Sequence, residues 1–275
     1  MARNGERASR AKKRHPDSRR QRTIREVGLN AATAVLQTSI TLAVPTPEGQ
    51  LVAAGIASAI GDVAKRILSP REEDRVEEVI RLAAEKIKDA EKSGANPRTD
   101  LEPGMLEELA EGTLLAAKDT YEKKKLPFLA TLLSNGYFFS TPVPNLLGAL
   151  QAAEELTYRQ LCILAAVWPR DPWDGPALTN GTLNDVLAVR PLTEDIQGIV
   201  FDVVVLVQQH LVMPFRKGQY IAGVTMAELV PAELRQTYPG RVIFFGMKLA
   251  DIPAEDRDEI LRVLGAKGVA RSKQP

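Results

Sequence analysis

The sequence NLLGALQAAEELTYRQLCILAAVWP, residues 145–169, reads as a short helix that runs into a second, capped helix. Thr157 and Gln160 have the spacing of a capping box, in which each side chain satisfies a backbone N–H at the start of the second helix. The residues before this stretch are amphipathic, and those after it are more apolar and more broken. We therefore expect the stretch to join two halves of the fold. Five apolar residues should share one face of it: Leu156, Leu161, Leu164, Val167 and Trp168.

The composition is ordinary for a globular protein. The chain has 275 residues, of which 44% are hydrophobic and 26% charged, so it can bury a sizeable core. Its length allows one large domain or two smaller ones. The single cysteine, Cys162, excludes an internal disulfide and fits a reducing compartment. The N-terminus lacks the apolar run of a secretory signal. We expect a cytoplasmic protein, which could also associate with a membrane.

Residues 1–26 predict a disordered basic arm, because they are highly charged and poor in apolar side chains. Residues 1–25 hold ten Lys or Arg against two acidic residues, a net charge of +8; the whole chain carries +1, which leaves −7 for the remainder. The arm could be a solubilising tail, or it could bind an anionic membrane surface or nucleic-acid phosphate. It has no aromatic residue that could stack on single-stranded bases. Its candidate anion-binding residues are Lys12, Lys13, Arg14, Arg19, Arg20 and Arg22.

Residues 27–68 predict a small-residue apolar hairpin. Residues 27–61 contain one charge, Glu48, and are split by Pro45 and Pro47. Each half is shorter than the roughly 20 residues needed to span a bilayer. Small residues at i, i+4 spacing let helices approach closely, so the segment could pack on the body, enter a membrane or self-associate. The small residues of this ridge are Ala53, Gly55, Ala57, Ala59 and Gly61.

Residues 69–152 predict a helical domain. Ser69 and Glu72 form a capping box around a proline at the first helical position, so a helix should begin there. A second helix is expected over residues 102–125, with Tyr121 on its inner face and its three final lysines near its negative end. A third helix should begin near Pro127 and stop at Asn135-Gly136.

Residues 153–265 predict a second set of elements, followed by a tail over residues 266–275. Val203–Val207 alone would fit either a helix or a strand. The length of the segment and a cap at Thr193, followed by two acidic residues, favour a buried helix over residues 193–213. Residues 241–249 fit either a strand or a short helix. Thr225 and Glu228 have capping-box spacing.

The sequence points to no catalytic residue, metal site or cofactor. His210 is expected to be a partly buried residue of the apolar helix, and Cys162 a small core residue. Most carboxylates fall on the solvent faces of the predicted helices. A site assembled in three dimensions from distant residues stays open.

From about Met105 onward, the phrases LLAAKDTYEKKKLPFLATLLSN and LTYRQLCILAAV, followed by the late Pro239-Gly240 turn, resemble uncharacterised bacterial helical proteins. They are also loosely similar to the abortive-infection alpha (Abi-alpha) proteins of phage defence, which join a helical region to a winged-helix-like end. The resemblance implies a bacterial cytoplasmic protein with a role in defence or stress. It supplies no catalytic residues.

We therefore predict a mainly α fold, a multi-helix bundle with a C-terminal winged-helix-like helical module and at most a short β-hairpin. The candidate recognition helix, residues 193–213, has no Lys or Arg. A DNA-reading helix needs such side chains, so this module should make protein contacts or be structural.

For function, we predict a non-enzymatic bacterial interaction protein. It would engage a membrane surface or form a homo-oligomer through residues 27–68, while the helical body senses or binds a partner protein. The first alternative is nucleic-acid binding through residues 1–25, and the second is an enzyme whose site the sequence does not reveal.

Overall fold

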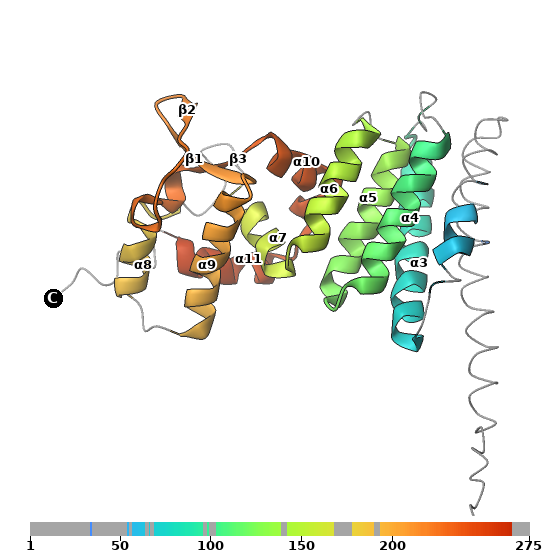
Figure 1. Ribbon diagram of the computed structural model, residues 1–275, viewed down its shortest axis with the longest axis horizontal. Coiled ribbons are helices and arrows are strands. Elements are labelled where there is room, and N and C mark those ends of the chain that lie inside the picture. The colour runs from blue at the N-terminus through green and yellow to red at the C-terminus, as the bar shows by residue number, and fades with distance from the viewer. Residues whose placement is uncertain are drawn as a thin grey trace, which may run out of the picture.

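The computed structural model describes residues 34, 54, 57–63, 66, 69–95, 98, 103–138, 142–167, 178–189 and 193–265. These residues form a mainly α-helical structure with one small antiparallel sheet, which confirms the predicted fold class. The helices of residues 70–155 stand side by side in one half of the molecule (Figure 1). The remaining helices and the sheet make up the other half, from residue 158 onward.

The first long helix, α3 (Pro70–Lys92), begins as its sequence predicts. Ser69 Oγ accepts from the backbone N–H of Glu72, and the Glu72 carboxylate accepts from the N–H of Ser69. Helices α4 (Pro103–Asp119) and α5 (Leu126–Phe138) pack against α3. The apolar stripe of α3 is buried in this contact and consists of Val76, Val79, Ile80, Ala83 and Ile87.

The prediction that α4 continues to residue 125 is wrong. The helix ends at Asp119, and the three lysines form a separate 3-10 turn, η1 (Lys123–Lys125). Tyr121, expected on the inner face, is 94% exposed. Lys125 is buried and donates to backbone carbonyls of another helix, so tertiary contacts rather than the dipole of α4 hold the lysine turn in place.

The predicted stop of α5 at Asn135-Gly136 is also wrong, because the helix runs on to Phe138. Both residues are buried inside the molecule. The Asn135 amide donates to the carbonyls of Phe245 and Gly246, which belong to a helix of the other half. On its own, this residue pair favours a helix end. In the fold, it lies inside α5 and allows close packing between two helices.

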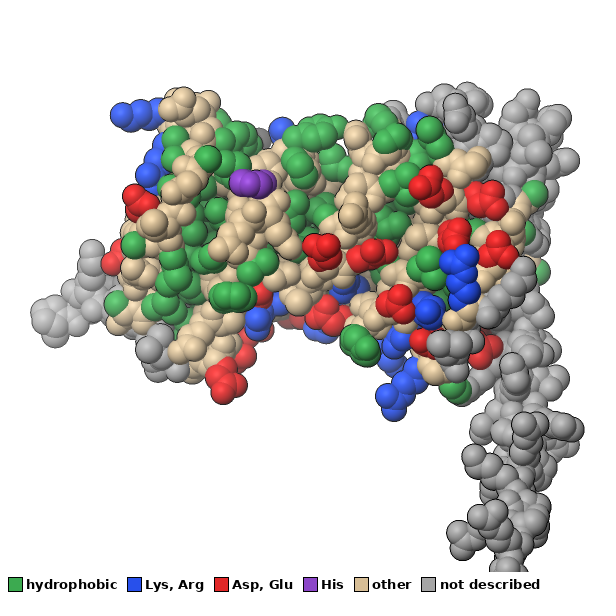
Figure 2. Space-filling model, in the orientation of Figure 1, with side chains coloured by type: hydrophobic (Ala, Val, Ile, Leu, Met, Phe, Trp, Pro, Cys, Tyr) green, Lys and Arg blue, Asp and Glu red, His purple; other side chains and the backbone are tan. Residues whose placement is uncertain are grey.

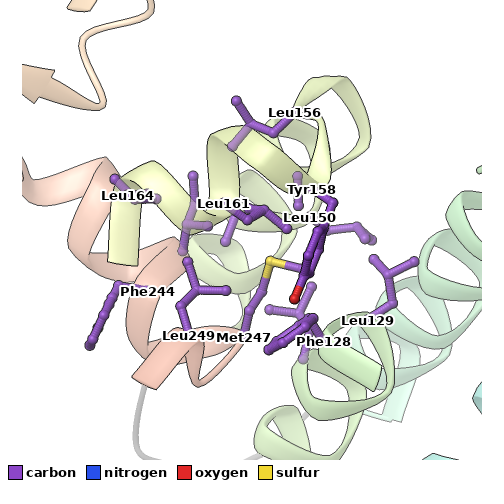
Figure 3. Close-up of a cluster of buried hydrophobic side chains, with 14 of the residues drawn as sticks. Phe128, Leu129, Leu150, Leu156, Tyr158, Leu161, Leu164, Phe244, Met247 and Leu249 are labelled. Carbon is purple, nitrogen blue, oxygen red and sulfur yellow. The ribbon is translucent and has the colours of Figure 1, made fainter. Parts of the chain in front are cut away.

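Helices α6 (Val143–Glu155) and α7 (Tyr158–Ala166) form the predicted joint. The capping box of Thr157 and Gln160 is present in both directions. Side chains from α5, α6 and α7 converge on one apolar cluster, in which the ring of Tyr158 lies beside that of Phe128 (Figure 3). Trp168 lies outside the described residues. The other expected apolar residues of the joint are buried: Leu156, Leu161, Leu164 and Val167.

The next pair of helices is α8 (Leu183–Val189) and α9 (Glu194–Gln208). Thr193 caps α9, and residues 203–207 are helical, which decides between the helix and strand alternatives. The helix ends five residues before the predicted limit at Met213. His210, expected to be partly buried on the helix, is exposed in a left-handed backbone conformation.

The sheet follows α9 directly. Strand β1 (Val212–Arg216) pairs antiparallel with β2 (Gln219–Tyr220) and with β3 (Leu234–Gln236), in the order β2-β1-β3. Lys217 and Gly218 make the tight turn between β1 and β2, and both have positive φ. Such two-residue turns match the twist of the flanking strands.

Two short 3-10 turns, η2 (Met226–Glu228) and η3 (Pro231–Glu233), lead into β3, and the predicted capping box of Thr225 and Glu228 forms on η2. Helix α10 (Tyr238–Gly246) follows, so residues 241–249 do not form a strand. The turn η4 (Leu249–Asp251) connects α10 to the final helix, α11 (Ala254–Leu264). Helix α10 packs on α5 and α6, which ties the end of the chain to its first half.

Candidate functional site

A groove lies between α6 and α10, where the two halves of the chain meet. Its volume is about 220 Å³ and its walls are mainly apolar. Helix α6 leaves room for it because its groove-facing side carries the small residues Gly148, Ala149 and Ala152. The lining residues are Pro144, Asn145, Gly148, Ala149, Ala152, Tyr238, Pro239, Val242 and Ile243.

Two glycines hold α10 in position beside the groove. A Cβ at Gly240 would lie 2.1 Å from the carbonyl oxygen of Leu211, so α10 starts in direct contact with the chain that enters β1. A Cβ at Gly246 would lie 3.0 Å from the side chain of Leu132, on α5. Thr237 caps the helix through the N–H of Gly240. The groove is therefore set by backbone packing.

A hydrogen bond crosses the mouth of the groove. Asn145 Nδ2 donates to the hydroxyl oxygen of Tyr238 at 2.7 Å, which links α6 to α10. Tyr238 is 59% exposed and Phe245, two turns further along α10, is 56% exposed. Figure 2 shows hydrophobic side chains on the surface over the upper ends of α6 and α10. The site thus combines an apolar hollow with exposed aromatic rings.

A second cluster of polar residues lies at the joint. Asp256 of α11 accepts from Lys124 Nζ at 2.7 Å and from the Tyr158 hydroxyl at 2.8 Å. The hydrogen bond from Lys124 holds the pKa of Asp256 below its ordinary value. Burial raises the pKa of the nearby Cys162 thiol to about 12, and the Asp256 carboxylate adds to that rise. Thiolates rather than thiols are reactive, so the raised pKa leaves Cys162 inert. The hydrogen bonds of the cluster hold α11 against α7 and the lysine turn.

A third polar cluster connects α7 to α9. Asp202 is 4% exposed, and its two carboxylate oxygens accept from Arg159 Nε at 2.5 Å and Gln160 Nε2 at 2.9 Å. Burying a carboxylate is costly unless it is paired, and here both oxygens are satisfied. The arrangement is structural, because the carboxylate faces its partners in the interior.

The predicted site residues of the apolar segment differ in burial. In the helical stretch of residues 57–63, Ala57 is half-buried, Ala59 is buried and Gly61 is exposed with open space around it. Ala53 and Gly55 lie outside the described residues, as do the six candidate anion-binding residues of the arm. Within this stretch, Ala59 faces the core and Gly61 faces solvent.

No helix among the described residues is long and apolar enough to cross a membrane. Within the same part of the chain, no group of three His, Cys, Asp or Glu side chains is placed to hold a metal ion.

Sequence reasoning missed the groove. The signal for one wall was present as Gly148, Ala149 and Ala152, at helical spacing within residues 145–169. The other wall comes from Tyr238 and Val242, and nothing local in the sequence places that segment against α6.

No protein-family model matches this chain, and neither a curated protein nor a solved structure is significantly similar to it.

Proposed function

We propose that this chain is a non-enzymatic interaction protein that docks a protein partner in the groove between α6 and α10. The observation that carries the proposal is an apolar hollow of about 220 Å³ at an exposed surface, with Tyr238 at its mouth. This volume is below the roughly 300–1,000 Å³ of small-molecule sites. It suits one large apolar side chain, and such side chains in pockets dominate the energy of many interfaces.

The polar groups of the joint support a binding role over a catalytic one. Lys125 is occupied by backbone carbonyls, Asp202 by Arg159 and Gln160, and Cys162 has a raised pKa. These groups rigidify the scaffold that carries the groove. A preformed groove binds with little loss of conformational entropy.

Engagement of a membrane, or self-association, through residues 27–68 remains our prediction for that segment. At its described end, Ala59, Ile60 and Val63 are buried in the core, and Arg66 pairs with Glu111 of α4 at 2.8 Å. These contacts support packing on the body for this end of the segment.

The order α8, α9 and the β1–β2 hairpin supports the winged-helix-like module that we predicted. Helix α9 presents Gln197, Phe201 and Gln208 to solvent and has no Lys or Arg. This surface favours protein contact over reading of DNA. Nucleic-acid binding through residues 1–25 and a role in bacterial phage defence remain predictions that do not depend on the described residues.

The groove can be tested by filling it. Peptides are selected from a phage-displayed 12-residue library against the full-length protein, and their affinities are measured by isothermal titration calorimetry. Gly148→Leu should weaken binding at least about tenfold, because the peptide's apolar anchor loses its pocket. A Cβ at Gly148 meets no atom within 4 Å, so the variant should fold.

The matched control is Gly104→Leu, which makes the same change at an exposed and equally open helical position on α4. It should leave peptide affinity unchanged. Equal affinity of the selected peptides for wild type and for Gly148→Leu would contradict docking in the groove.

A further inference from the structure

Arg241 is an exposed cation beside the groove that makes no ion pair within the described part of the chain. Two other cations of the same half are paired. Arg216 lies 2.5 Å from Glu233, and Lys248 lies 3.0 Å from Asp251. Arg241 is therefore the positive charge that α10 leaves available to a partner.

Tyr238 places a second donor next to this charge. Its hydroxyl oxygen accepts from Asn145 Nδ2, so its own proton is left for another acceptor. Tyr238 and Arg241 are three residues apart on α10, so their side chains are neighbours on one side of the helix. A hydroxyl donor beside a guanidinium suits a carboxylate, which only accepts hydrogen bonds when it is ionised.

The surroundings of these donors fit a protein ligand. Tyr238 and Phe245 are both more than half exposed on α10, and the apolar hollow opens beside Tyr238. Tyrosine and arginine are enriched among the residues that dominate interface energies. An anchor in the hollow and a carboxylate at Arg241 would lie on the two sides of Tyr238, about one helical turn apart.

We infer that the α6–α10 groove recognises an acidic amphipathic segment of a partner protein, whose large apolar side chain enters the hollow while an adjacent Asp or Glu binds Arg241 and the Tyr238 hydroxyl. This inference rests on the groove being the docking site proposed above. The chain's own basic arm does not fit this role, because its net charge of +8 has the same sign as Arg241.

The test uses the peptides selected against the full-length protein. Those that depend on the groove should share a large apolar residue with Asp or Glu three or four positions away. Arg241→Glu should weaken them about threefold to tenfold, since it removes one exposed ion pair and adds a repulsion. Changing the peptide's acidic residue to Lys should restore binding to the Arg241→Glu variant.

Two further variants test whether the charge of Arg241 and the hydroxyl of Tyr238 act specifically. Arg71→Glu makes the same charge reversal at an exposed position of α3 and should leave peptide affinity unchanged. Tyr238→Phe keeps the ring and removes the hydroxyl, so it should weaken the acidic peptides by about twofold to fivefold. The same variant should not affect peptides whose acidic residue has been replaced by Ala, which has no side-chain acceptor.

The outcomes separate this inference from the proposed function. Peptides that lose affinity for Gly148→Leu but bind Arg241→Glu as well as wild type would overturn the acidic ligand and keep the groove. Peptides insensitive to Gly148→Leu would overturn both. If analytical ultracentrifugation shows a wild-type dimer that Gly148→Leu dissociates, the occupant is a second copy of this chain, and the inference of a separate acidic partner is wrong.

Discussion

The ammonium of Lys125 donates a 2.6 Å hydrogen bond to the backbone carbonyl of Leu156, although Lys125 is 4% exposed. It also reaches the carbonyl of Glu154 at 3.4 Å. The last carbonyls of a helix have no partner within the helix and favour a nearby cation. From the same turn, Glu122 accepts from the backbone N–H of Tyr158 at the start of α7. One short turn therefore holds the end of α6 and the beginning of α7.

Replacing Lys125 by methionine should destabilise this joint. The variant keeps much of the apolar volume but leaves the carbonyls of Glu154 and Leu156 without their donor. We expect the free energy of unfolding to fall by about 1.5–3 kcal/mol, the usual contribution of hydrogen bonds to a charged group. Urea denaturation at pH 7 measures it. Lys123→Met, on the exposed side of the same turn, should change stability by less than about 0.5 kcal/mol.

The same lysine predicts a dependence of stability on pH. Burial lowers the pKa of Lys125 from its ordinary value of 10.5. Between the lowered folded pKa and 10.5, the unfolded chain binds more protons than the folded chain, so this group's contribution to stability rises with pH. The stability difference between wild type and Lys125→Met should therefore grow with pH in that window and stay constant below it. A difference that shrinks as pH rises would show that the ammonium is stabilised in the fold.

The single thiol should be unreactive in the folded protein. Cys162 is 2% exposed, and burial raises its pKa to about 12. At pH 8 we expect no measurable reaction with Ellman's reagent in native buffer and complete reaction of one thiol in denaturant, because the reactive thiolate is scarce and shielded. Reaction of the native protein at the rate of the denatured protein would mean that the joint opens readily.

Gly198 on α9 should be coupled energetically to Arg159. A Cβ at Gly198 would lie 2.8 Å from both terminal nitrogens of the Arg159 guanidinium, which Asp202 holds in place. Alanine normally gains about 0.5–1 kcal/mol over glycine inside a helix. We expect that gain for Gly198→Ala in an Arg159→Ala background, and little or none in the wild-type background. A double-mutant cycle by urea denaturation measures the coupling, and equal effects in the two backgrounds would refute it.

Alanine substitutions at two helical glycines beside the groove should change the free energy of unfolding in opposite directions. Gly240→Ala would place a Cβ 2.1 Å from the backbone carbonyl of Leu211, so α10 must shift, and we expect a loss of about 3 kcal/mol or more. Gly148→Ala meets no atom within 4 Å and should gain about 0.5–1 kcal/mol. Denaturation curves followed by circular dichroism test both. A tolerated Gly240→Ala would contradict the close contact between α10 and the backbone of Leu211, just before β1.

Helix beginnings were predictable because their signals are local. The capping boxes at Ser69 and Thr157 both form, and the Thr193 cap correctly favoured a helix over a strand for α9. In each case the interacting groups lie within one turn of each other, so distant parts of the chain are not needed to bring them together.

Helix ends were less predictable where distant segments supply the partners. Asn135-Gly136 has the character of a helix stop. In the fold, the Asn135 amide donates to the carbonyl of Gly246 at 2.9 Å, across 111 positions of the chain, and Gly136 lies against Leu109. The lysines at 123–125 fit the end of a helix by charge, yet the partner of Lys125 is the end of α6.

One wall of the candidate site was visible in the local sequence, and the other depends on a distant segment. The small residues that form one wall of the groove were visible within residues 145–169. The opposite wall is brought to it across 93 positions, the separation of the hydrogen-bonded pair Asn145 and Tyr238. A groove needs both walls, so the sequence of either segment alone could not indicate it.

The amino-acid sequence by itself determined the helical class, the capped starts of α3, α7 and α9, and the apolar stripe of α3 that faces the core. These features follow from residue periodicity and from neighbours within one turn. Long-range packing decided where α4 and α5 end, that His210 is exposed, that Lys125 is buried, and that α6 and α10 enclose a groove. Contacts between segments far apart in the chain set these features, and tertiary contacts outweigh local propensities that are worth less than about 1 kcal/mol per residue.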